Sequence, residues 1–310
     1  MSNSSTQLPP APVVSVGPVV LAAPGRGADL QVRISAPVTG SQLPLIVFAH
    51  GFGSSLDGYA PLVQYWAARG FAVLQPTFLD SRTLALAPDD PRQPTIWRQR
   101  VLDMKSVLDH LDQLEAAVPG LAGRLDRRRV AAVGHSYGAQ TAGMLLGARV
   151  LGADGQPGES LADPRIQVGV LLSATGEGGA NLQPFAAQLF PFMSPSFAEM
   201  TTPALVVAGD HDQSPLSFRG PDWFTDAYTR SPASAHDCLL TLFGAEHLLG
   251  GISGYLVTET TDEHPERVAA VQQLTWAYLQ SAFNPGDQSW AAAQATLAEA
   301  PSPLGQVTCK

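Results

Sequence analysis

Residues 130–140 constrain the fold more than any other stretch of the chain. The apolar run Val130–Val133 predicts a buried strand, and Gly134-His135-Ser136-Tyr137-Gly138 follows it as a sharp turn. A helix is expected from Ala139 to Leu151. Such a turn forces the serine backbone into a strained conformation, and side chains at either glycine would collide with the neighbouring strand and helix. The start of the helix also directs its amide groups and the positive end of its dipole toward the serine.

The rest of the chain alternates between apolar runs and helical patterns. Strands are expected at 13–20, 29–35, 45–49, 71–75, 168–172, 204–208 and 239–243, and helices at 59–69, 96–114 and 264–283. Because each central strand is a nearly continuous apolar run, the pattern predicts an α/β fold with a mostly parallel sheet and helices on both faces. The first two strands are expected to form a hairpin at a sheet edge.

The domain organisation follows from the same pattern. We expect a disordered Ser/Pro-rich segment over 1–12, a single α/β domain over 13–283, and a tail over 284–310 that packs on the domain or trails from it. The stretch 174–202 is rich in glycine and then in aromatic residues. It predicts either a helix on the sheet face or a short flap, so any cap over the sheet is small.

Polar residues gather where the predicted strands end. They are His50 to Gly53, Ser136, Asp210 with Asp212, and His247. Ligands bind at the carboxyl ends of parallel strands, so these residues are expected to meet. A serine needs a base within hydrogen-bond reach to become a nucleophile, histidine suits that role near neutral pH, and a carboxylate orients the histidine.

Candidates compete for the base and for the acid. Of seven histidines, only His247 follows the final predicted strand in a loop of small residues, whereas the His135 ring is expected to turn away from the site. Either Asp210 or Asp212 could be the acid. The spacing Gly209-x-x-Asp212-x-x-Pro215 favours Asp212, which would leave Asp210 to brace the loop as an Asx turn.

An oxyanion needs two backbone amides directed at the developing charge. One is expected from Tyr137, which follows the serine, and the other from Phe52, which follows a central strand. The side chains expected to line the substrate site are Phe52, His135, Tyr137, Trp97 and Phe185.

Over residues 29–283 the chain resembles the α/β-hydrolase superfamily. The likeness is carried by Leu45–Phe52, Gly134–Gly138, Asp212 and His247. It is most similar to the serine-esterase branch that contains platelet-activating-factor acetylhydrolases, chlorophyllases, and cutinase-like or dienelactone-hydrolase-like proteins. The segments Arg100–Glu115 and Arg124-Leu125-Asp126 resemble the acetylhydrolase pattern. The resemblance implies hydrolysis of carboxylic esters through a Ser-His-Asp triad and an acyl-enzyme.

The chain departs from two of these relatives. Dienelactone hydrolases use cysteine where this chain has Ser136, and animal acetylhydrolases place the acid where this chain has Ser173-Ala174-Thr175. A serine also disfavours haloalkane dehalogenases and epoxide hydrolases, which use aspartate at that turn. The expected substrate is a hydrophobic ester with a short or medium acyl chain. A thioesterase or amidase, a polyester or cutinase-like hydrolase, and a non-catalytic binding protein of the same fold are the alternatives, and the complete set of three residues disfavours the last.

Composition excludes some partners. The net charge of -9, with no basic run beyond 124–129, argues against nucleic-acid binding, and that run is expected to be a solvated loop. No apolar run approaches the ~20 residues of a membrane-spanning helix. No cofactor or metal is expected, the partner is a small-molecule or lipid-like ester, and the protein is expected to be a monomer or small homo-oligomer.

Compartment and cysteine chemistry are also constrained. The first ten residues lack the basic end and apolar centre of a signal peptide, so the chain as written is expected to be cytoplasmic, or secreted if it is a mature form. Two cysteines do not make a disulfide framework. Cys238 and Cys309 are expected to be free thiols, with a bridge that ties the C-terminal segment to the core as the alternative.

Overall fold

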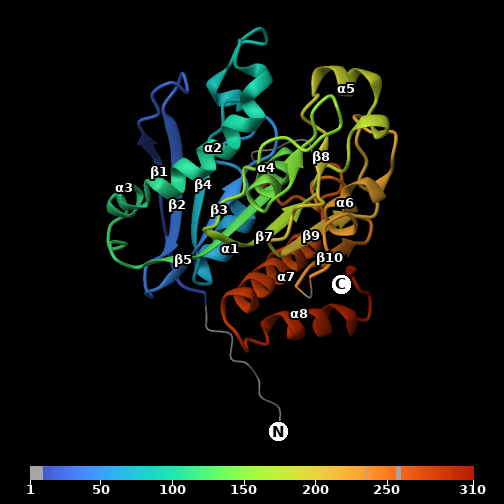
Figure 1. The fold of residues 1–310 in the computed structure, drawn as a ribbon. Helices are drawn as coiled ribbons and strands as arrows, with labels where there is room; N and C mark the ends of the chain where they lie inside the picture. The colour runs from blue at the N-terminus through green and yellow to red at the C-terminus, as the bar shows by residue number, and fades with distance from the viewer. Residues whose placement is uncertain (1–9, 235, 256–259) are drawn as a thin grey trace.

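A nine-stranded sheet runs through the protein in the order β1-β2-β4-β3-β5-β7-β9-β10-β11 (Figure 1). The computed structural model describes residues 10–234, 236–255 and 260–310. The strands of this sheet are β1 Val13–Leu21, β2 Leu30–Pro37, β3 Leu43–Ala49, β4 Ala72–Pro76, β5 Leu125–His135, β7 Ile166–Leu172, β9 Ala204–Gly209, β10 Cys238–Leu242 and β11 Gly305–Cys309. The six strands from β4 to β10 pair in parallel, while β1, β2 and β11 are antiparallel additions at the two edges.

Helices cover both faces of the sheet, as the sequence predicts. They are α1 Ala60–Ala68, α2 Ile96–Asp109, α3 Leu111–Ala116, α4 Tyr137–Leu145, α5 Pro184–Leu189, α6 Asp226–Thr229, α7 Pro265–Phe283 and α8 Ser289–Ala298. Short 3-10 turns lie at Arg82–Leu84, Gln93–Thr95, Gly179–Asn181 and Pro221–Thr225, and β6 Arg149–Val150 pairs with β8 Pro195–Ser196. The predicted fold class is confirmed.

Side-chain alternation along β3 separates the two apolar layers. Leu45 and Val47 are buried in the core with α2 and α4, whereas Ile46 and Phe48 are buried in the core with α1 and α7. Because successive residues of a strand point to opposite faces, a run that is apolar throughout must be covered on both sides. The sheet is therefore held rigidly, and the loops at its carboxyl edge have a fixed platform.

Several element boundaries differ from the sequence expectation. The helix expected over 96–114 is divided at His110, whose ring Nδ1 lies 2.8 Å from the carbonyl oxygen of Ser106. The helix after Ser136 ends at Leu145 because Gly147 adopts a left-handed φ of 117°. Residues 125–129 of the basic run, expected to be a loop, lie in the first half of β5, where the strand bulges relative to β3.

The C-terminal segment, expected to be a tail, contains α8 and β11. Helix α8 packs on α7, and β11 extends the sheet by pairing with β10. The expectation of free thiols was wrong, because Cys238 and Cys309 face each other in that strand pair and form a disulfide. The two cysteines are 71 residues apart, and a strand pairing over that distance leaves no local signal in the sequence.

The N-terminal expectation lies mostly outside the described residues, which begin at Pro10. The Ala11 N–H donates to the carbonyl oxygen of Ala68 at 2.8 Å, at the end of α1. Among the described residues, no helix has both the length and the apolar composition that crossing a membrane requires.

Candidate active site

A strained turn joins β5 to α4 and presents Ser136 at the carboxyl edge of the sheet. Ser136 has φ 56° and ψ −122°, and its N–H donates to the carbonyl oxygen of Leu172 on β7 at 2.9 Å. A Cβ atom on Gly134 would lie 2.1 Å from the carbonyl oxygen of Gly138, and one on Gly138 would lie 2.0 Å from that of Ala49. No side chain can occupy these distances, so both glycines are required for the turn.

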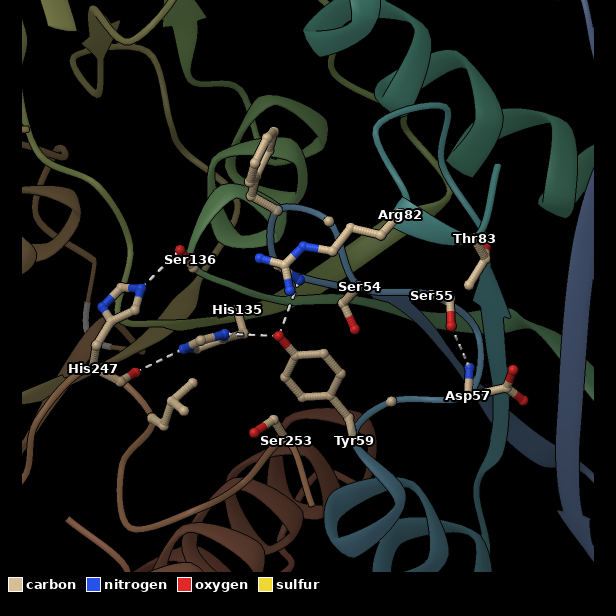
Figure 2. Close-up of a pocket in the computed structure, with 15 residues that line it drawn as sticks. Ser54, Ser55, Asp57, Tyr59, Arg82, Thr83, His135, Ser136, His247 and Ser253 are labelled. Carbon is tan, nitrogen blue, oxygen red and sulfur yellow. Dashed lines mark hydrogen bonds between the residues drawn. The ribbon is translucent and has the colours of Figure 1, made fainter. Parts of the chain in front are cut away.

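Three loops bring Ser136, His247 and Asp212 into one hydrogen-bonded series. The His247 Nε2 atom lies 2.8 Å from the Ser136 Oγ (Figure 2), and its Nδ1 lies 3.0 and 3.1 Å from the two carboxylate oxygens of Asp212. Asp212 is completely buried behind the imidazole. The residues come from the ends of β5, β10 and β9, where the sequence places them.

Asp210, the competing carboxylate, has a different partner. It is exposed, and its Oδ1 accepts a hydrogen bond from the Gly244 N–H at 2.6 Å. It therefore connects the loop after β9 to the loop after β10, whereas the sequence suggested an Asx turn within its own loop. The two loops are already close, because a Cβ on Gly209 would lie 2.1 Å from the carbonyl oxygen of Ala245.

The loop at residues 50–53, after β3, is held on both sides of Phe52. The buried Arg100 guanidinium donates to the carbonyl oxygen of His50, and the Asp80 carboxylate accepts from the Gly53 N–H at 3.1 Å. Arg100 and Asp80 also pair directly, with an Nη1–Oδ1 distance of 2.6 Å. Among the described residues, neither the Phe52 N–H nor the Tyr137 N–H donates to another group of the chain.

Burial and charge set the ionisation of these supporting groups. Arg100 lies between the rings of Phe78 and Tyr137, with its central carbon 4.0 and 4.3 Å from the two ring centres. Burial raises the pKa of the Asp80 carboxyl, but Arg100 and other partners outweigh it and hold that pKa below its usual range. Burial, and then Arg100, lower the pKa of His50 to about 4, so this ring is neutral near pH 7.

Sequence reasoning missed the supporting role of Arg100 and Asp80. Arg100 lies four residues before Met104, on the apolar face of the predicted helix. A cation at such a position needs a buried anion or a row of carbonyl groups to offset its desolvation. That mismatch was a signal that the arginine has an internal partner, although it did not identify Asp80.

A cavity of about 520 Å³ adjoins Ser136 and is lined mainly by polar side chains. Phe52, His135 and His247 border it as well, and its far wall consists of Ser54, Ser55, Asp57, Tyr59, Arg82, Thr83 and Ser253 (Figure 2). The expectation that the His135 ring turns away from the site was wrong. Its Nε2 lies 2.8 Å from the carbonyl oxygen of His247, so the ring contacts the backbone of that residue.

A second cavity, of about 810 Å³, has a more apolar lining that includes Trp97, Leu182 and Phe192. A row of rings leads toward it from the serine. Ring centres are 6.4 Å apart for Phe52 and Tyr137, 5.4 Å for Tyr137 and Phe192, and 6.5 Å for Phe192 and Trp97.

The residues expected to line one substrate site are therefore divided among different places. Phe52 and His135 border the first cavity, Trp97 borders the second, and Tyr137 lies in the row of rings between them. Phe185 is 48% exposed on α5 and is not among the residues that line either cavity.

Comparison with known proteins adds one positive finding. The model of the alpha/beta hydrolase family matches residues 46–304, which include the turn at Ser136 and the loops that carry Asp212 and His247. No curated protein matches the chain. Within the described residues there is no group of three or more histidine, cysteine or acidic side chains that could hold a metal ion.

Proposed function

The chain belongs to the alpha/beta hydrolase family, and from that premise we propose that it is a serine hydrolase of carboxylic esters. One observation carries the proposal. A hydroxyl, an imidazole and a buried carboxylate form a series with contacts of 2.8 Å and 3.0 Å, and the hydroxyl belongs to a serine in a strained turn. This arrangement is the one that serine nucleophiles require.

In the proposed reaction, the Ser136 Oγ attacks the ester carbonyl carbon while its proton moves to the His247 Nε2. Asp212 accepts from the Nδ1–H of His247, which fixes the tautomer and stabilises the imidazolium. The N–H groups of Phe52 and Tyr137 stabilise the oxyanion of the tetrahedral intermediate. His247 then returns its proton to the leaving alcohol, which breaks the ester C–O bond and leaves an acyl-enzyme.

A water molecule completes the cycle by the same route. It gives a proton to His247 and attacks the acyl-enzyme carbonyl, and collapse of this second intermediate releases the acid and restores the Ser136 hydroxyl. His135 and His50 take no proton in this scheme, because burial lowers the pKa of each ring to about 3 and about 4, respectively.

The linings of the two cavities support a substrate ester that carries a polar group on one side of its carbonyl and an apolar group on the other. Hydroxyl and charged groups line much of the cavity at Ser136, whereas the row of rings from Phe52 to Trp97 leads to the apolar cavity. We expect short and medium acyl esters to be cleaved faster than long ones. A series of p-nitrophenyl esters from acetate to palmitate tests this, and a maximum at palmitate would contradict it.

A polyester hydrolase is the second candidate, favoured by the exposure of Phe52. Phe52 is 63% exposed and borders the same cavity as Ser136, where its ring could lie on an aromatic or aliphatic polymer segment. Release of soluble acid from a polyester film, compared with turnover of p-nitrophenyl butyrate, separates the candidates. A thioesterase would use the same three residues and would be distinguished by its rate on an acyl thioester.

The disulfide bears on the proposed compartment. Stable disulfides form in oxidising compartments and are rare in the cytosol, so the Cys238–Cys309 bridge supports the secreted alternative over the cytoplasmic one.

Covalent labelling tests the proposed function directly. A fluorophosphonate probe is expected to label the wild-type protein, and Ser136→Ala is expected to abolish both labelling and turnover of p-nitrophenyl butyrate. Ser106→Ala is the matched control, because Ser106 is a half-buried serine on α2 outside both cavities. Turnover by Ser136→Ala at the wild-type rate would refute the assignment.

A further inference from the structure

Two buried side chains, Tyr59 and His135, connect the loop that carries Phe52 to the loop that carries His247. The Gly51 N–H donates to the Tyr59 hydroxyl at 3.0 Å, and that hydroxyl lies 2.9 Å from the His135 Nδ1. The His135 Nε2 in turn lies 2.8 Å from the carbonyl oxygen of His247. Figure 2 shows the dashed contacts that join the Tyr59 hydroxyl to His135 and His135 to His247.

The direction of each hydrogen bond is determined by the two ends of the series. The Gly51 N–H can only donate, so the Tyr59 oxygen accepts from it and directs its own proton to the His135 Nδ1. The carbonyl oxygen of His247 can only accept, so the His135 Nε2 carries the proton of that ring. One neutral tautomer satisfies every member, and burial together with the nearby His247 keeps the ring neutral by lowering its pKa to about 3.

The backbone is shaped to allow these contacts. A Cβ on Gly51 would lie 2.9 Å from the Tyr59 hydroxyl oxygen and 3.4 Å from the His135 Nδ1, so a side chain at this position would push the Tyr59 hydroxyl out of place. Tyr59 itself has a left-handed φ of 64°, which is unusual for a bulky residue, and its N–H is anchored to the carbonyl oxygen of Ser253 at 2.9 Å. Strained residues of this kind persist only where the surrounding structure holds them, and they cluster at active sites.

We propose that Tyr59 and His135 are positioning residues, which hold the backbone of His247 and the loop that carries Phe52 in register with Ser136. The proposal rests on the proposed function. Neither side chain exchanges a proton with the substrate in this role. Instead, the series fixes the carbonyl group of His247 and thereby the direction of its imidazole, which must stay within 2.8 Å of the Ser136 Oγ. A displacement of about 1 Å at such a group costs roughly a hundredfold in rate.

Tyr59→Phe is the first test, because it removes only the hydroxyl. It leaves the Gly51 N–H without an acceptor and the His135 Nδ1 without a donor. With p-nitrophenyl butyrate, we expect kcat to fall roughly tenfold and KM to stay within about twofold, since alignment of the base is changed while phenylalanine keeps the ring at the cavity wall. Tyr278→Phe is the matched control. Tyr278 is buried to nearly the same extent as Tyr59, and its hydroxyl donates to a backbone carbonyl at 2.8 Å, but it lies on α7 away from the site.

Substitutions of His135 provide the second test. His135→Gln can keep an N–H group near the Nε2 position for the carbonyl oxygen of His247, whereas His135→Leu cannot. We expect Gln to retain a higher kcat than Leu at this position. The two side chains act in one series, so their substitutions are not expected to be additive. The kcat of the double variant Tyr59→Phe/His135→Leu is expected to lie within about twofold of that of His135→Leu alone.

The possible outcomes separate this proposal from the proposed function. Absence of ester turnover in the wild-type protein would refute the proposed function. An active wild-type protein with unchanged kcat in Tyr59→Phe and in both His135 variants would refute the positioning role alone. An equal fall of kcat in Tyr59→Phe and Tyr278→Phe would also refute it, because general destabilisation would then explain the loss. Melting temperatures of all variants, expected to fall by only about 3 °C for each lost hydroxyl, exclude simple unfolding.

Discussion

Acidification from about pH 8 to about pH 5 is expected to destabilise the fold through His135. Burial is the largest cause of the lowered pKa of this ring, from its usual value of 6.5 to about 3. A histidine whose pKa is lower in the folded state stabilises the fold fully above 6.5, and this contribution is lost as the pH falls toward 3. At pH 5 the unfolded chain has bound the proton and the folded chain has not. A pH of 5 lies about 1.5 units below the usual pKa of 6.5. This interval corresponds to a loss of about 2 kcal/mol of unfolding free energy.

The assay compares wild type and His135→Gln by urea denaturation at both pH values. Glutamine does not titrate, so the loss of unfolding free energy on acidification is expected to be about 2 kcal/mol smaller in the variant. His50, whose pKa is lowered to about 4, acts in the same direction in both proteins, and its contribution cancels. Tyr278→Phe is the control for a loss of stability that does not come from the titration of His135. It removes no group that titrates between these pH values, and it is expected to keep the wild-type difference.

The reasoning has a clear point of failure. If wild type and His135→Gln lose the same unfolding free energy between the two pH values, then His135 binds its proton as readily in the folded protein as in the unfolded chain and is protonated at pH 5. The buried series that keeps the ring neutral would then not hold at that pH, because a protonated ring cannot accept from the Tyr59 hydroxyl.

Three further predictions concern the acid, the turn and the disulfide. Asp212→Asn is expected to lower kcat on p-nitrophenyl butyrate by roughly 10⁴-fold, as loss of the orienting carboxylate does in serine proteases. Asp210→Asn is expected to lower kcat by less than about twofold. A larger loss in Asp210→Asn than in Asp212→Asn would exchange the roles of the two carboxylates. Gly138→Ala, whose Cβ would lie 2.0 Å from a carbonyl oxygen of β3, is expected to lose ~3 kcal/mol or more of unfolding free energy. Gly220→Ala, with open space around its Cβ, should melt near the wild-type temperature by circular dichroism. Cys309→Ser opens a loop of 71 residues and is expected to cost about 4 kcal/mol in urea denaturation, and an unchanged midpoint would contradict that.

The sequence was most informative where the signal is local. The apolar run of β5, the two glycines around Ser136 and the helix that follows are contiguous, so their steric requirements can be read directly from the chain. The continuous apolar strands likewise determine a sheet buried on both faces. The order of Ser136, Asp212 and His247, each in a loop that follows a strand, then predicts where they meet, because parallel strands end at one edge.

Contacts between distant segments were decided only by the tertiary structure. Strand β11 pairs with β10 across 71 residues, and the Cys238–Cys309 bridge follows from that register. Arg100 reaches the loop at His50 only because α2 packs against α4 beneath it. None of these pairings has a periodicity or spacing that identifies its partner in advance.

His135 shows most clearly what the fold adds to the motif. In the sequence it is only a residue within the turn, and its ring direction was predicted wrongly. In the structure that ring lies between the Tyr59 hydroxyl and the carbonyl oxygen of His247, which are 76 and 112 residues away in the chain. The sequence by itself determines which residues have the required chemistry, since turns and strands are local. The packing of the sheet determines which polar groups share one buried space, because hydrogen bonds there depend on distances that only the assembled fold defines.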